Sequence, residues 1–144
     1  MLVIVGQNGW KSEAFFERLA THSYRQDILL TGFIEKKLLP QAYHHSLALI
    51  YPSIYEGFGF PVLEAMACGT NVICPNNSSL PEVGGDLAFY YPTQDINALT
   101  SQMVLVSSRG EDVKASRSRV AARAATFSWT KYVEIFNAYL DSLA

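Results

Sequence analysis

Few cysteines and no excess of charge characterise this 144-residue sequence. The two cysteines, Cys68 and Cys74, are too few for a disulfide scaffold and have no metal-ligand spacing, so a reducing, cytosolic setting is the default. The net charge is only -2, because 11 basic residues stand against 13 acidic ones. A general nucleic-acid-binding protein would carry a basic excess, so nucleic acid is not an expected partner. No apolar run approaches the roughly 18 residues of a membrane-spanning helix.

The length and the hydrophobic content of 49% predict one globular domain with a substantial core. Internal repeats, low-complexity stretches and linkers are absent from the sequence. Residues 2–5 form an apolar run that reads as a buried strand, and no basic segment of a signal peptide precedes it. Because the chain opens directly on a strand, we expect residues 1–144 to be a single domain of a longer protein.

Short apolar runs alternate with amphipathic segments along the chain. The runs end at glycine or proline and predict strands at residues 2–5, 27–31, 47–51, 71–74 and 87–91. Helical spacing predicts helices at residues 12–20, 38–46, 61–68, 95–106 and 112–126, and from Ser128 onward. Continuous apolar strands between helices indicate a parallel sheet covered on both faces. The expected fold class is therefore α/β, a Rossmann-like doubly wound sheet.

Two of the predicted helices have apolar stripes that we expect to face the core. The first stripe consists of Ile96, Leu99, Met103 and Val106. The second, in the last helix, consists of Tyr132, Val133, Phe136, Tyr139, Leu140 and Leu143. Ser12 and Ser128 are the expected N-caps of the first and last helices.

The segment after the third predicted strand combines a glycine turn with the start of a helix. Gly57 and Gly59 flank Phe58, so the backbone can turn sharply and approach a ligand closely. A helix begins near Pro61, and the free N–H groups and positive dipole end of a helix suit a phosphate. Proline has no N–H, so the expected donors are Phe60, Val62 and Leu63.

Two acidic residues bracket this turn. Glu56 precedes it, and Glu64 lies about one turn into the helix. A carboxylate can accept two hydrogen bonds from a vicinal diol, so one acid would hold a sugar hydroxyl and the other a ribose. The residues alone also allow a plain structural role, with Glu64 beside the helix dipole and Glu56 as a solvated loop residue.

Residues 52–69 resemble the signature of the retaining glycosyltransferases of family four, or glycosyl transferases group 1, which have the two-domain GT-B fold. That signature is a glutamate, seven residues and a second glutamate, and Glu56 and Glu64 match it. The flanking sequences Gly-Phe-Gly-Phe-Pro-Val-Leu and Ala-Met-Ala-Cys-Gly-Thr also match. Weaker matches cover nearly the whole chain, at residues 32–34, 78–83, 85–86 and 127–129. The resemblance implies the C-terminal, donor-binding half of a GT-B enzyme.

The resemblance also implies a role for each matched position. Glu56 would act near the anomeric carbon of the donor sugar, and Glu64 would bind the ribose hydroxyls. The base pocket would be lined by Phe33 and Ile34. The residues that would hold the donor sugar and the diphosphate are Gly57, Phe58, Gly59, Phe60 and Val62.

The implied reaction is transfer of a hexose from a nucleoside-diphosphate sugar to an acceptor hydroxyl, with retention, in polysaccharide or glycolipid biosynthesis. The acceptor glycan or glycolipid would bind through an N-terminal domain, so the fragment alone should be inactive. The implied location is the cytoplasm, with peripheral association at the inner face of the membrane left open. No metal or other cofactor is expected, because helix dipoles and basic residues neutralise the diphosphate in this fold and the sequence has no Asp-X-Asp motif.

Two departures from the family pattern stand out. The family's arginine and lysine that bind the diphosphate have no match, since Lys11 follows the first strand instead of preceding it, and Asn71 replaces the usual proline. Two alternatives stay open, a nucleotide-sugar epimerase of the same fold and a non-catalytic nucleotide-binding module. The module predicts that mutation of Glu56 in the full-length protein leaves sugar transfer intact, whereas a transferase predicts a large loss of turnover.

Three further features have simpler interpretations. His44 and His45 are adjacent on a predicted helix and point in different directions, which disfavours a shared metal ion. Six of the 11 basic residues fall between Arg109 and Lys131 and predict a solvated helix face, with contact to anionic lipid or to the N-terminal domain as the alternative. The stripe of the last helix would be exposed without that domain, which would favour self-association.

Overall fold

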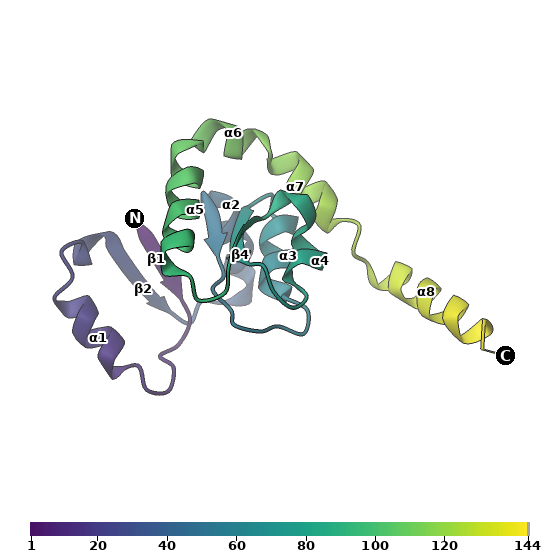
Figure 1. Cartoon of the computed structure of the whole chain (residues 1–144), viewed down its shortest axis with the longest axis horizontal. Coiled ribbons are helices and arrows are strands. Elements are labelled where there is room, and N and C mark those ends of the chain that lie inside the picture. Colours follow the sequence, from purple (N-terminus) through teal and green to yellow (C-terminus); the bar gives the residue numbers. More distant parts are fainter. Residues whose placement is uncertain (144) are drawn as a thin grey trace. The chain divides into compact units, whose positions relative to one another are not determined.

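The computed structural model describes residues 1–143, which divide into one compact unit of Met1–Leu39 and another that begins at Pro40. Both units contain parallel strands and helices (Figure 1), which confirms the α/β fold class. That residues 1–144 form one domain of a longer enzyme stays a prediction. Along residues 1–143, every helix is too short or too polar to cross a lipid bilayer.

The first unit is built on a pair of parallel strands, β1 (Leu2–Val5) and β2 (Ile28–Gly32), in which Leu2 pairs with Ile28. Between them lie α1 (Glu13–Ala20) and a 3-10 turn, and a second 3-10 turn follows β2. Our expectation that residues 2–5 are buried is wrong, because Leu2, Val3 and Val5 are 38%, 43% and 44% exposed. With two strands and one α-helix, this unit buries only Leu19.

The second unit has a three-stranded parallel sheet in the order β3 (Ala48–Ile50), β4 (Asn71–Pro75) and β5 (Phe89–Tyr91). All five residues of the central strand β4 are buried. Val72 and Cys74 belong to one apolar cluster, and Ile73 between them belongs to another. Because successive side chains of a strand point to opposite faces, both faces of β4 are covered, as the continuous apolar run predicts.

Helices from both halves of this unit supply the two clusters. The cluster on the Val72 face draws on α3 (Phe60–Ala67), α4 (Leu80–Gly84) and α7 (Arg117–Ala124). The cluster on the Ile73 face draws on α5 (Ile96–Ser108) and α6 (Gly110–Ala115). A short helix, α2 (Leu39–His45), precedes β3, and α8 (Trp129–Asp141) ends the described chain. In Figure 1 the central strand β4 lies between α5 and α3.

The helix predicted over residues 112–126 is interrupted at Ser116, between α6 and α7. The Ser116 hydroxyl donates to the backbone oxygen of Val113 at 2.7 Å and to Asn71 Oδ1 at 2.9 Å. The Asn71 amide in turn donates to the same Val113 oxygen at 2.9 Å. These side-chain bonds to the backbone compete with helix continuation and fasten the break to the start of β4.

The predicted inward stripes fit the structure only in part. In α8 no residue is buried, although the Ser128 hydroxyl caps the helix by accepting from the Lys131 N–H at 3.1 Å. In α5, Val106 is buried but Ile96, in the first turn, is 76% exposed. The spacing of apolar residues along a helix predicts which face is apolar but not what packs against it, so it did not predict burial here. Ser12 lies at the N-terminus of α1, but its side chain forms no capping bond.

Candidate functional site

A left-handed glycine starts helix α3. Gly59 has φ +94, and a Cβ placed on it would lie 2.7 Å from Leu80 Cδ2. Glycine is therefore required here both by backbone conformation and by the close packing of α4. Pro61 occupies the first turn of α3, and Gly69 with φ +73 follows its C-terminus, both as predicted.

The N–H groups of this turn differ in availability. The Gly59 carbonyl accepts from the N–H of Val62 at 3.0 Å and of Leu63 at 3.2 Å. These two N–H groups are thus engaged within the helix, and Val62 is fully buried, which corrects our expectation that both serve as free donors. Within residues 1–143, the N–H groups of residues 57–60 donate to no other group. The available donors therefore precede Pro61.

The Glu56 carboxylate is held by hydroxyl groups. Its Oε1 accepts from the Tyr51 hydroxyl at 2.6 Å and from the Ser53 hydroxyl at 2.7 Å. These bonds favour the ionised form and lower the pKa of Glu56 below its ordinary value. The Glu56 backbone is also held, because its N–H donates to Ser78 Oγ at 3.2 Å and its carbonyl accepts from Ser79 Oγ at 3.1 Å.

Glu64 is exposed on α3 and has one longer contact, from the Tyr43 hydroxyl to its Oε2 at 3.4 Å. Burial, followed by the charge of Glu64, raises the pKa of Tyr43 to about 12. Burial and the bond to Glu56 likewise raise the pKa of Tyr51 to about 12. Both tyrosines pack against the core cluster that includes residues of α3. Each acid is thus hydrogen-bonded to a tyrosine that rests on the same core cluster.

Sequence reasoning missed these hydroxyl partners. Tyr51 and Ser53 lie five and three residues before Glu56, so their nearness in the chain was a usable signal. Tyr43 lies 21 residues before Glu64 on another helix, and only the tertiary structure, in which Tyr43 packs against the core cluster, brings them together.

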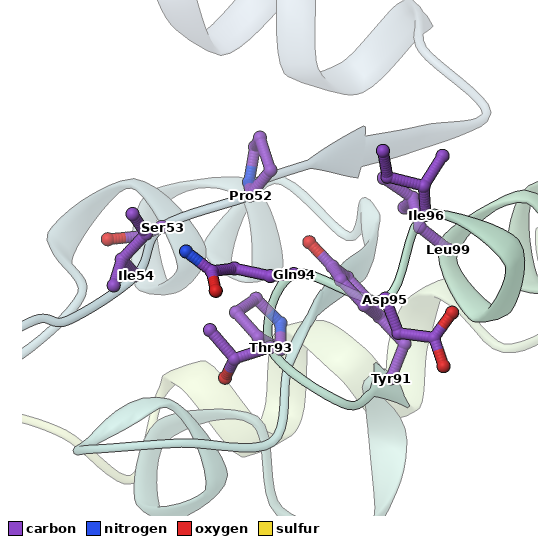
Figure 2. Close-up of a pocket in the computed structure, with 10 residues that line it drawn as sticks. Pro52, Ser53, Ile54, Tyr91, Thr93, Gln94, Asp95, Ile96 and Leu99 are labelled. Carbon is purple, nitrogen blue, oxygen red and sulfur yellow. The ribbon is translucent and has the colours of Figure 1, made fainter.

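A small hollow lies at the carboxyl ends of β3, β4 and β5 (Figure 2). Its volume is about 120 Å³, and its walls include Ser53, Ile54, Thr93 and Gln94. Gln94 has φ +66, and its side chain extends toward Ser53 and Ile54 in Figure 2. The Asn77 amide ties two of the loops together by donating to Ile54 O and Thr93 Oγ1, both at 2.7 Å. The hollow has room for a small chemical group only.

Other predicted positions lie away from the turn in the sequence or serve the fold. Phe33, which is 68% exposed, and the half-buried Ile34 follow β2 in the first unit, and their role in base binding stays a prediction. Within residues 1–143, no group of three or more His, Cys, Asp or Glu side chains is arranged to hold a metal ion. The rings of His44 and His45 pack edge to face with centroids 5.3 Å apart.

Two members of the predicted basic face are structural instead of solvated. Arg117 donates to the carbonyl of Gly69 at 3.2 Å and to that of His44. Arg123 donates to the carbonyl of Val83 at 3.2 Å and to that of Glu82. Cations at the C-terminal ends of helices stabilise the unpaired carbonyls there, so these arginines fasten α7 to its neighbours.

The parallel strands, the glycine turn at the start of α3 and the paired glutamates are the features that the sequence shares with the glycosyltransferase signature. The model of the family described as glycosyl transferases group 1 matches residues 1–124. The chain belongs to this family.

Among curated proteins, the chain is 32% identical over 139 residues to the O-antigen chain mannosyltransferase B of Escherichia coli, a match that covers 96% of this chain and 36% of that protein. It is 35% identical over 108 residues to the serotype-specific mannosyltransferase WbdA of Escherichia coli, with 73% of this chain and 13% of that protein covered. The chain thus spans about a third or less of the length of these relatives.

Solved structures confirm the fold. Sucrose-phosphate synthase from Thermosynechococcus elongatus superposes with a TM-score of 0.79 at 24% identity, covering 99% of this chain and 38% of that one. The lipopolysaccharide outer core galactosyltransferase WaaB superposes with a TM-score of 0.74 at 21% identity, covering all of this chain and 41% of that one. Both likenesses support the GT-B-type α/β architecture.

Proposed function

We infer that the protein containing this chain is a retaining hexosyltransferase, and that this chain binds its nucleoside-diphosphate sugar donor. The observation that carries the proposal is the pair Glu56 and Glu64 on either side of the Gly59 turn, in a member of the glycosyl transferases group 1 family. The acceptor is a glycan or glycolipid hydroxyl, and the product belongs to polysaccharide or glycolipid biosynthesis.

Mannose is the hexose to test first. The two Escherichia coli relatives described above are named as mannosyltransferases, and one of them acts on an O-antigen chain. The nucleotide base is left open, so guanosine, uridine and adenosine diphosphate sugars belong in the same comparison.

Each part of the site has a role that follows from its chemistry. The N–H groups of residues 57–60 face no partner in the described chain and bind the donor sugar and the distal phosphate. Glu64 binds the ribose diol through its carboxylate. Glu56 is held ionised and stabilises the positive charge that develops at the anomeric carbon as the diphosphate leaves. The leaving phosphate accepts the proton of the acceptor hydroxyl on the same face, which gives retention without a metal ion.

A thermal-shift panel tests donor binding. The intact protein is heated with GDP-mannose, UDP-glucose and ADP-glucose in turn, and with the matching nucleoside diphosphates. A donor present at about 100 times its dissociation constant adds about 2.7 kcal/mol to the free energy of unfolding. One donor should raise the melting temperature clearly more than the others. No shift with any nucleotide at millimolar concentration in the intact protein would contradict donor binding.

Glu64→Ala should weaken donor binding and leave the chemical step largely intact. Loss of a charged hydrogen-bond acceptor for the ribose is expected to raise the donor KM on the order of tenfold, with a small change in kcat. Steady-state kinetics with varied donor measures both constants. Glu134→Ala, at an exposed glutamate of helix α8, is the matched control and should leave KM unchanged. An equal loss of kcat and kcat/KM in Glu64→Ala would assign this residue to the transition state instead.

A further inference from the structure

We propose that Tyr51 and Ser53 are positioning residues that fix the Glu56 carboxylate for sugar transfer without neutralising its charge. The inference rests on the proposed function, in which Glu56 stabilises positive charge at the donor sugar. It assigns a task to two hydroxyl groups that the family signature of two glutamates does not include.

Both hydroxyls use the same oxygen atom. The Tyr51 and Ser53 hydroxyls donate to Glu56 Oε1 at 2.6 and 2.7 Å, which are lengths typical of strong O–H···O⁻ bonds. Within residues 1–143, the other oxygen, Oε2, accepts no hydrogen bond. One oxygen is thus anchored, and the second is left available to a ligand.

The anchors are themselves held by the sheet and by the following loop. The Tyr51 N–H donates to the carbonyl of Ile73 at 2.9 Å and so continues the pairing of β3 with β4 beyond Ile50. The Glu56 backbone is fixed separately by the hydroxyls of Ser78 and Ser79. Glu64, by contrast, has a single contact of 3.4 Å and stands exposed. Only one of the two signature glutamates is built to keep one orientation.

The two hydroxyl groups that donate to Glu56 are neutral, so the carboxylate keeps its full negative charge. Along residues 1–143, the ion pairs are Lys37 with Glu35 and Lys114 with Glu111, and none includes Glu56. The titratable group that bonds to Glu56 is Tyr51, next to which lies Tyr43, and both phenols have a pKa of about 12 and stay neutral. A cationic partner would cancel the negative field of the carboxylate. Neutral hydroxyls preserve that field for a developing oxocarbenium-like centre.

The test uses Tyr51→Phe and Ser53→Ala in the full-length protein. Each variant removes one hydrogen bond to the charged form, so the pKa of Glu56 should rise toward its ordinary value. The activity that needs ionised Glu56 is then lost at a higher pH, and the acid limb of the kcat/KM profile should move upward in pH. At neutral pH, kcat should fall on the order of tenfold in each single variant, because the carboxylate is less well oriented. The double variant should lose more than either.

Matched variants separate positioning from folding. Tyr55→Phe changes a tyrosine of the same loop that is 80% exposed and should leave the acid limb in place. Ser53→Thr retains a hydroxyl and should restore most of the activity lost in Ser53→Ala. Thermal melts of every variant should stay within a few degrees of the parent, which a hydrogen bond to an accessible carboxylate permits.

The outcomes distinguish this inference from the function on which it rests. If Glu56→Gln abolishes transfer while Tyr51→Phe and Ser53→Ala leave both kcat and the acid limb unchanged, the positioning role is wrong and the transferase proposal stands. If Glu56→Gln transfers sugar as fast as the parent, the catalytic role of Glu56 in the proposed function is overturned, and the positioning role falls with it. An upward shift of the acid limb in Tyr51→Phe, absent in Tyr55→Phe, supports the positioning role.

Discussion

Glu56→Gln is expected to lower kcat for sugar transfer by two to three orders of magnitude, about the loss that follows removal of one preorganised electrostatic stabiliser. The substitution keeps the size of the side chain, and its amide oxygen can still accept from the Tyr51 hydroxyl. What it removes is the negative charge that the developing positive charge on the sugar would meet. Donor affinity should change little, since Glu64 and the N–H groups of the turn remain. Single-turnover rates and calorimetric binding measure the two quantities separately.

Glu134→Gln is the control for this result, because it makes the same chemical change at an exposed position of α8. It should transfer sugar at the parent rate. A Glu56→Gln variant that binds the donor and also transfers sugar normally would favour the non-catalytic nucleotide-binding module. A variant that no longer binds the donor would instead place Glu56 in ground-state recognition.

The acidic pH limit follows from the same carboxylate. Because hydroxyl bonds lower the pKa of Glu56 in the folded protein, their stabilising contribution is present above the ordinary carboxyl pKa and is lost as the pH falls through the lowered value. Tyr43 and Tyr51, with pKa values of about 12, stay neutral hydroxyl donors throughout the physiological range. Within the group formed by Tyr51, Ser53 and Glu56, the carboxylate is therefore the member that titrates on acidification, and it does so below the ordinary carboxyl pKa.

Local signals explain why the centre of the site could be predicted from the sequence. Gly59 indicates a turn with positive φ, and Pro61 and Gly69 indicate where the following helix begins and ends. These rules concern neighbouring residues and need no tertiary context. The buried strand β4 was predictable for a similar reason, since an uninterrupted apolar run has no polar face to expose.

Features that depend on distant residues could not be predicted. The break at Ser116 exists because its hydroxyl reaches Asn71, 45 residues away in the chain. The Val62 N–H was missed for a local reason, because the Gly59 carbonyl three residues back accepts a hydrogen bond from it, and which first-turn N–H groups remain free depends on how that turn closes. The helical spacing of apolar residues predicted the apolar face of α8, but whether that face is buried depends on which surface, if any, packs against it.

Gly59→Ala should destabilise the chain by about 3 kcal/mol and suppress sugar transfer. Left-handed backbone costs an alanine roughly 1–2 kcal/mol, and overpacking in a core costs typically about 1–3 kcal/mol. Both penalties apply, because φ is +94 and the added Cβ would lie 2.7 Å from Leu80 Cδ2. Relief of the contact would shift the N–H groups of residues 57–60 that are proposed to bind the donor. Urea unfolding and donor KM measure the two effects.

Gly57→Ala is the matched control, because a Cβ there meets no atom within 4 Å and its φ lies outside the left-handed region. Its free energy of unfolding should stay within about 1 kcal/mol of the parent.

A double-mutant cycle that combines Gly59→Ala with Leu80→Ala separates the backbone penalty from the packing penalty at Gly59. Leu80 is fully buried, so Leu80→Ala alone destabilises by about 2–5 kcal/mol. With the leucine removed, Gly59→Ala should lose the packing penalty and keep the backbone penalty, giving a coupling energy above about 1 kcal/mol. Strict additivity would mean that α4 does not constrain the turn, and the requirement for glycine would then rest on φ alone.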